Sequence, residues 1–235
     1  MAHVSEERRV RAIVALDAPS QADADRIVDA LGDSCDFYKV GSELFTAAGP
    51  AAVTRLRDRG KDVFLDLKFH DIPNTVRGAV RSASRLGASL VTVHISGGTD
   101  MLRAAVDGAG EDCGVLGVTV LTSMDARRLS ESWGRTVNTI EEEVLRLAEV
   151  ARAAGAHGIV CGAGEASAVR AAHGDSLRLL VPGIRLPGSD THDQARPATP
   201  GEAVAAGASY LVLGRTVTGA ADPRDAMRRV VEAVG

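Results

Sequence analysis

Residues 63–75 combine acidic and basic side chains at spacings that suit acid–base chemistry. The first half of this stretch alternates like a β-strand, which predicts that Asp66 and Lys68 share the face opposite its apolar residues. Asp71 follows three residues after Lys68, just before a Pro-Asn turn. A buried charge is costly unless it is paired. The pattern therefore indicates either a structural ion pair or an active site.

The bulk composition argues against several classes of protein. The chain has 235 residues, 45% hydrophobic and 25% charged, with a net charge of −4 that gives no general attraction for nucleic acid or membranes. Cys35, Cys113 and Cys161 lack CxxC spacing, which predicts buried reduced thiols. Residues 1–9 are too polar for a signal peptide, and no apolar run approaches the roughly 20 residues that span a bilayer. We expect a soluble cytoplasmic protein.

Short apolar segments alternate with helical segments along the chain. Strands are predicted over residues 12–17, 37–41, 62–68, 89–94, 115–121, 157–161, 177–181 and 210–214. The clearest helix covers residues 139–154, with Thr139 as N-cap and residues 141–143 as a solvated acidic first turn. Eight strand–helix units predict an α/β fold, a single (β/α)8 barrel over residues 1–235 with a polar lead-in at 1–9. A doubly wound sheet would need a glycine-rich first turn, which Asp17-Ala-Pro-Ser is not.

Polar residues follow the predicted strands at their C-terminal ends, where barrels of this kind carry their active sites. They are Asp17, Lys39, Asp66, Lys68, His94, Thr122, Ser123, Arg185, Gly214 and Arg215. This coincidence favours an active site over a structural ion pair. For His94, a packing role is the preferred interpretation, and for His70 a structural or interface role.

Two predicted connections, residues 122–138 and 183–199, are longer than the rest, which is typical of lids and binding loops. Arg185 and Arg196 give the second loop a charge that suits an anion, although Arg196 is equally well explained as a solvated surface residue. Gly214-Arg215 add backbone N–H groups and a guanidinium. Because the loops after strands seven and eight usually bind phosphate in barrels, we expect a phosphate group there.

Residues 64–75, Phe-Leu-Asp-Leu-Lys-Phe-His-Asp-Ile-Pro-Asn-Thr, resemble the signature of the orotidine 5'-phosphate decarboxylase family. The resemblance is to bacterial members and extends over residues 15–17, 38–41, 91–94, 118–123, 181–185, 193–196, 198–200 and 213–215. The Asp-x-Lys-x-x-Asp core alone is shared with sugar-phosphate enzymes of the same barrel group. Leu180-Val181 before Pro182 departs from the bacterial pattern, which often has Thr beside that proline. The difference concerns barrel packing and no catalytic residue.

The resemblance implies a carboxy-lyase that removes CO2 from orotidine 5'-monophosphate to give uridine 5'-monophosphate, the last step of pyrimidine biosynthesis, with no cofactor and no metal. It implies a catalytic Lys-Asp-Lys-Asp array made of Lys39, Asp66, Lys68 and Asp71. The implied substrate-binding residues are Asp17, Lys39, Asp66, Thr75, Thr122, Ser123, Pro182, Arg185, Gln194, Gly214 and Arg215. It also implies a homodimer in which Asp71 and Thr75 reach the neighbouring subunit's site.

These residue types suit that chemistry. Loss of CO2 from pyrimidine C6 leaves a carbanion in the ring plane, and no cofactor motif offers an electron sink, so electrostatic placement and proton supply remain. Lys68 would stabilise the negative charge at C6 and then protonate it. Asp66 would repel the departing carboxylate. Flanking carboxylates offset the desolvation of Lys68 and keep it charged.

Two alternatives stay open at this point. A metal-dependent sugar-phosphate decarboxylase or aldolase of the same barrel group would bind Mg²⁺ through an acid at the end of the second strand, where this chain has Lys39. A non-catalytic nucleotide-binding barrel is the other alternative, and the intact charged set argues against it.

Overall fold

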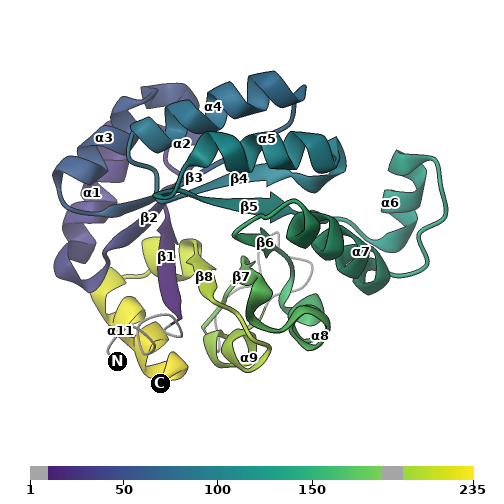
Figure 1. The fold of residues 1–235 in the computed structure, drawn as a ribbon. Coiled ribbons are helices and arrows are strands. Elements are labelled where there is room, and N and C mark those ends of the chain that lie inside the picture. The colour runs from purple at the N-terminus through teal and green to yellow at the C-terminus, as the bar shows by residue number, and fades with distance from the viewer. Residues whose placement is uncertain (1–9, 187–197) are drawn as a thin grey trace, which may run out of the picture.

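The strands of this protein close into a parallel barrel in the order of the chain (Figure 1). The structure is a computed structural model that describes residues 10–186 and 198–235. Its strands are β1 (Arg11–Ala15), β2 (Phe37–Gly41), β3 (Asp62–Phe69), β4 (Leu90–His94), β5 (Gly114–Val118), β6 (Gly158–Val160), β7 (Arg178–Val181) and β8 (Tyr210–Leu213). β1 pairs with both β2 and β8, which closes the barrel and confirms the predicted (β/α)8 architecture.

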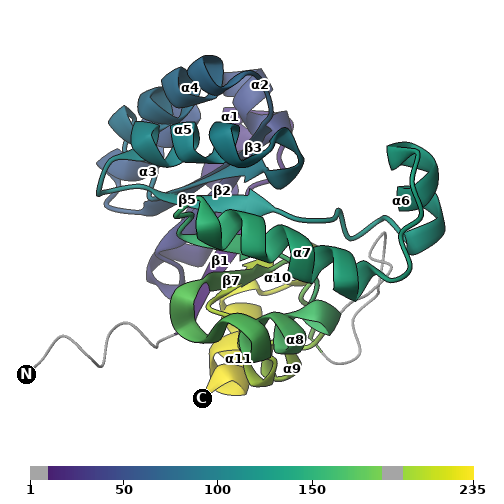
Figure 2. The ribbon, with the colours of Figure 1, turned by 45° about the vertical axis from the view of Figure 1, so that its right-hand side comes forward.

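Helices surround the barrel, as the two views in Figures 1 and 2 show. They are α1 (Gln21–Leu31), α2 (Ser42–Ala48), α3 (Ala51–Asp58), α4 (Pro73–Arg85), α5 (Thr99–Ala109), α6 (Ala126–Trp133), α7 (Ile140–Ala153), α8 (Ala163–His173), α9 (Pro200–Ala205), α10 (Arg215–Thr218) and α11 (Pro223–Val234). Thr139 caps α7 as predicted, because its hydroxyl accepts the Glu142 N–H at 3.1 Å. No helix among the described residues is long and apolar enough to cross a membrane.

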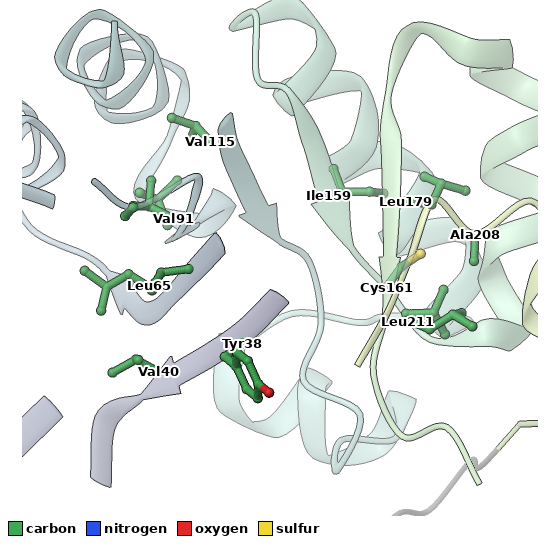
Figure 3. Close-up of a cluster of buried hydrophobic side chains, with 14 of the residues drawn as sticks. Tyr38, Val40, Leu65, Val91, Val115, Ile159, Cys161, Leu179, Ala208 and Leu211 are labelled. Carbon is green, nitrogen blue, oxygen red and sulfur yellow. The ribbon is translucent and has the colours of Figure 1, made fainter. Parts of the chain in front are cut away.

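Two apolar layers follow from the alternation of side chains along each strand. The inner layer fills the barrel and consists of Ile13, Ala15, Phe37, Phe64, Leu90, Leu116, Leu180 and Val212. The outer layer packs the strands against the helices, and Figure 3 shows part of it, including Tyr38, Leu65, Val91 and Leu179. The three cysteines are free and buried, as expected from their spacing. Inward-facing polar residues that follow this inner layer along a strand therefore lie at the C-terminal mouth of the barrel.

The connection at residues 122–138 contains a helix that the sequence analysis did not predict. β5 ends at Val118 instead of residue 121, and α6 begins after Asp125, whose carboxylate accepts the Arg128 N–H at 2.8 Å. α6 lies apart from the other helices in both views (Figures 1 and 2). This segment is therefore a helical arm rather than an irregular loop. Residues 1–9 and 187–197, which include most of the second long connection, lie outside the described residues.

The acidic first turn of α7 is only partly solvated, which corrects the interpretation of residues 141–143. Glu143 is buried, and its carboxylate accepts hydrogen bonds from Arg135 at 2.6 Å and Arg146 at 2.5 Å. Arg135 follows the arm helix, so this ion pair ties the arm to α7. Burial would raise the pKa of Glu143, but the hydrogen bonds from Arg146 and Arg135 outweigh it and hold the pKa below its ordinary value.

We predict that Glu143→Gln lowers the free energy of unfolding by about 2 kcal/mol at neutral pH, because two arginines lose their charged partner. A carboxylate whose folded pKa is depressed stabilises the protein above its unfolded pKa. The difference between variant and wild type should therefore shrink as the pH falls through the folded pKa. Urea unfolding at several pH values measures it. Glu149→Gln is the control, because Glu149 pairs with Arg152 on an exposed face of the same helix. Equal effects of the two variants would contradict the prediction.

Candidate active site

Four charged side chains form a continuous row at the C-terminal mouth of the barrel. The Lys39 ammonium lies 2.8 Å from Asp17 Oδ1 and 3.7 Å from Asp66 Oδ2. The Lys68 ammonium lies 2.8 Å from Asp66 Oδ1. Asp17 follows β1, Lys39 lies in β2, and the other two lie in β3. The structure thus brings together Asp17, Lys39, Asp66 and Lys68, as predicted from their positions at strand ends.

The row is buried in its middle and more exposed at both ends. The side chains of Lys39 and Asp66 are only 11% and 13% exposed, whereas Lys68 is 36% and Asp17 59% exposed. Each buried charge has a partner of opposite sign, which offsets the cost of removing it from water. The more exposed ammonium, Lys68, is the one that a substrate at the mouth would meet.

Gly41 gives the Lys39 side chain the space that it occupies. A Cβ atom at this position would lie 2.8 Å from Lys39 Nζ and 3.2 Å from Asp17 Oδ1. Any larger residue would therefore push the ammonium away from its carboxylates. The close approach explains why a glycine ends β2.

β3 is irregular at the site, which simple alternation does not predict. Leu65 pairs with Val91 and Phe69 with Val93, so three residues of β3 lie opposite one residue of β4. Lys68 has a φ of +50°, and it is the one non-glycine residue with positive φ in the described parts of the chain. A left-handed backbone costs roughly 1–2 kcal/mol for such a residue. Bulges of this kind re-aim side chains next to active sites.

Thr92 is a site residue to which the sequence analysis assigned no role. It is fully buried in β4, its hydroxyl accepts the Lys68 backbone N–H at 2.9 Å, and it lies 2.9 Å from Asp66 Oδ1. The signal in the sequence was a polar residue between Val91 and Val93, on the inward face that also carries His94.

His70 and His94 lie beside this row, with ring centroids 5.5 Å apart. Desolvation by burial, together with the nearby charges of His70 and Lys68, lowers the pKa of His94, and Asp66 offsets this only in part. His94 is therefore neutral at neutral pH and adds no positive charge to the mouth.

Asp71 and Thr75 do not join the row within one chain. The Asp71 carboxylate accepts the Ile72 N–H at 2.6 Å, and among the described residues no lysine pairs with it. Residues 71–75 are all exposed, and Ile72 is 67% exposed. Within the described residues the row therefore reads Asp17-Lys39-Asp66-Lys68, and the fourth member of the predicted catalytic array is missing from it.

The residues predicted to bind the rest of a substrate follow β5, β7 and β8. Thr122 and Ser123 precede the arm helix, Pro182 follows β7, and Gly214 precedes the exposed Arg215 at the start of α10. Arg185 is buried, unlike a solvated surface arginine, and its backbone N–H donates to Ala198 O at 2.8 Å. Gln194 and Arg196 lie outside the described residues.

Two further observations bear on what the site can hold. Within residues 10–186 and 198–235, no group of three or more His, Cys, Asp or Glu side chains is arranged to bind a metal ion. A cavity of about 420 Å³ lies at the opposite end of the barrel, lined by Arg11, His157 and Tyr210, among others. The charged row does not line that cavity and lies at the other mouth of the barrel.

The fold is a closed (β/α)8 barrel with paired lysines and aspartates at the C-terminal ends of its strands. This is the arrangement of TIM-barrel enzymes, which carry their active sites at that face. A model of the "Orotidine 5'-phosphate decarboxylase / HUMPS family" matches residues 11–230. The chain belongs to this family.

Individual relatives agree with this assignment. The chain is 52% identical over 220 residues to an orotidine 5'-phosphate decarboxylase of Anaeromyxobacter dehalogenans, covering 94% of this chain and 96% of the relative. It is 46% identical to the enzyme of the same name from Moorella thermoacetica, covering 93% and 89%. The crystal structure of orotidine 5'-phosphate decarboxylase from Lactobacillus acidophilus superimposes with a TM-score of 0.86 at 36% identity, covering 97% of this chain and 100% of that one.

We predict that Gly41→Ala lowers kcat/KM for orotidine 5'-monophosphate by about tenfold or more. The added methyl group would displace the Lys39 ammonium, and a displacement of about 1 Å in an active site can cost that much. The unfolding temperature should change little, since the clash falls on the flexible end of Lys39. Steady-state kinetics and thermal unfolding of the same preparation measure both. Unchanged kcat/KM would show that the position of Lys39 does not matter to the reaction.

Proposed function

We propose that this protein decarboxylates orotidine 5'-monophosphate to uridine 5'-monophosphate and CO2, the last step of pyrimidine biosynthesis. The observation that carries the proposal is the ammonium of Lys68, held 2.8 Å from Asp66 at the barrel mouth of a chain in this family. The buried free thiols are compatible with a reducing compartment such as the cytoplasm.

The use of lysine supports proton transfer at this site. Only three of the 27 Lys and Arg residues are lysines, and two of them, Lys39 and Lys68, lie in the row. The third, Lys61, donates to backbone carbonyls of Gly32 and Cys35. Arginine stays protonated in proteins, whereas lysine can give up its proton. A site that needs both a positive charge and a proton donor therefore calls for lysine.

In the proposed reaction the bond between C6 and the carboxylate breaks, and its electron pair stays on C6. The Lys68 ammonium stabilises that charge and then transfers a proton to C6, after which solvent reprotonates the neutral amine. Asp66 faces the leaving carboxylate, and their repulsion disappears as neutral CO2 departs. Lys39, itself paired with Asp17, holds Asp66 in place, and Lys39 and Asp17 bind ribose hydroxyls.

Binding of the non-reacting part of the substrate completes the proposal. Large enzymic accelerations need up to about 23 kcal/mol of barrier lowering, more than one ion-pair row supplies. Binding energy from the phosphate can supplement it. Arg185, Gly214 and Arg215 are the proposed phosphate ligands, and Gln194 is proposed to bridge base and phosphate. Thr122 or Ser123 contacts the base, and Pro182 is a further proposed substrate-binding residue.

A homodimer would complete the charged row. We infer that Asp71 and Thr75 enter the neighbouring subunit's site, where Asp71 follows Lys68 and Thr75 binds ribose. The exposure of residues 71–75, and of Ile72 in particular, supports a contact with a second copy. An aspartate beside Lys68 would help to keep its ammonium charged before the reaction.

We predict that the purified protein consumes orotidine 5'-monophosphate, measured by ultraviolet absorbance, at the same rate with and without EDTA. Lys68→Ala should lower kcat by about 10²–10⁴-fold or more, because the proton donor is gone. Lys61→Ala is the matched control, since it removes a lysine from the opposite end of the barrel and should leave kcat unchanged. No loss of substrate at micromolar enzyme would end the proposal, and activity that disappears with EDTA would favour a metal-dependent relative.

We also predict that mixing inactive Lys68→Ala and Asp71→Ala proteins restores activity once subunits exchange. A hybrid two-fold dimer contains one site with all its residues, so recovery should approach about a quarter of wild-type activity. Mixing Lys68→Ala with Lys39→Ala is the control, because both residues serve their own subunit's site and no hybrid site is intact. Absence of recovery despite exchange, followed by mass spectrometry of labelled subunits, would count against a shared site.

A further inference from the structure

We propose that Thr92 is a positioning residue for the decarboxylation, one whose hydroxyl fixes both the backbone of Lys68 and the carboxylate of Asp66. The inference rests on the proposed function. It is carried by the irregular pairing of β3 with β4 and by the two contacts of a single oxygen atom.

The bulge in β3 creates a need that Thr92 meets. Between the Leu65–Val91 and Phe69–Val93 pairs, β3 contributes Asp66, Leu67 and Lys68, whereas β4 contributes Thr92 alone. A backbone N–H in such a bulge loses its regular ladder partner and must find another when it is shielded from water. Thr92 Oγ1 accepts the Lys68 N–H at 2.9 Å, so a side chain replaces the missing backbone carbonyl.

The direction of the second hydrogen bond follows from the first. A backbone N–H can only donate, so the hydroxyl accepts from Lys68 and keeps its own proton for another acceptor. That acceptor is Asp66 Oδ1, at 2.9 Å. The same carboxylate oxygen accepts the Lys68 ammonium at 2.8 Å. The backbone N–H and side-chain ammonium of Lys68 are thereby joined in one closed loop through Thr92 and Asp66.

This loop holds an unfavourable conformation. Lys68 has a φ of +50°, which lysine does not adopt readily, and the bond from its N–H to Thr92 helps to keep it there. Thr92 is fully buried, so water does not compete for its hydroxyl. Threonine is β-branched and stiff at χ1, and its place in β4 fixes the direction of Oγ1. Removing the hydroxyl would free Lys68 to turn away from Asp66.

A structural role alone is the rival explanation, and two variants distinguish it. Thr92→Val keeps the shape and removes the hydroxyl, whereas Thr92→Ser keeps the hydroxyl and removes a methyl group. The matched control is Ser89→Ala. The hydroxyl of Ser89, the residue before β4, also donates to an aspartate of β3, Asp62 Oδ1 at 3.3 Å, but at the opposite end of the barrel.

The experiment measures kcat and KM for orotidine 5'-monophosphate in wild type and the three variants. Thr92→Val should lower kcat by about 10- to 100-fold, the loss expected for a hydrogen bond to a charged group, with KM within about threefold. Thr92→Ser should recover kcat to within about threefold of wild type, and Ser89→Ala should leave it unchanged. In a crystal structure of Thr92→Val, the distance from Lys68 Nζ to Asp66 Oδ1 should exceed 2.8 Å, or the φ angle of Lys68 should differ from +50°.

Three outcomes would overturn the proposal for Thr92 while leaving the proposed function intact. The first is that wild type is active and Thr92→Val has the same kcat. The second is that Thr92→Ser is as impaired as Thr92→Val. The third is that the conformation of Lys68 is unchanged in Thr92→Val. A wild-type protein that leaves the nucleotide unchanged would instead overturn the proposed function, and with it the reaction that Thr92 serves.

Discussion

The burial of two opposite charges, Lys39 and Asp66, is the constraint on which the rest of the site depends. Each would be costly alone inside a barrel. Both are stabilised because the alternation of neighbouring strands points them inward at diagonal positions, with Lys39 opposite Phe64 and Asp66 opposite Gly41, above the apolar layer inside the barrel. Gly41 leaves room for the ammonium. The more exposed partners, Asp17 and Lys68, then extend the row to solvent, where a substrate can reach it.

Much of this arrangement could be predicted because it depends on local periodicity. Short apolar strands indicated the barrel, and polar residues at their ends indicated the mouth. The bulge in β3 could not be predicted, because it is a matter of register between two strands. A strict alternation places Asp66 and Lys68 on one face, as the structure does, but it gives no reason for the left-handed backbone of Lys68 or for the contacts of Thr92.

Sequence reasoning also missed how the segment between β5 and α7 folds. Three consecutive glutamates at the start of a helix suggest solvent, whereas the burial of Glu143 depends on Arg135, eight residues earlier, lying against it. The arm helix α6 has one buried residue, Leu129, so its apolar signal is weak. Asp71 is the reverse case, because the signature predicted its place in the charged row, whereas its carboxylate accepts the Ile72 N–H and pairs with no lysine among the described residues.

β3 also contains a second aspartate, and comparing the two distinguishes a structural ion pair from the one proposed to be catalytic. Asp62, at the start of the strand, pairs with Arg11 and Arg57 at 2.8 Å each. Burial would raise the pKa of Asp62, but the bonds from these arginines outweigh it and lower the pKa. Its partners are permanently charged, and its backbone is regular. Asp66 pairs with lysines, one of them on a left-handed backbone. Lysine partners in place of arginines, and a left-handed backbone at one of them, distinguish the end of the strand where the reaction is proposed to occur.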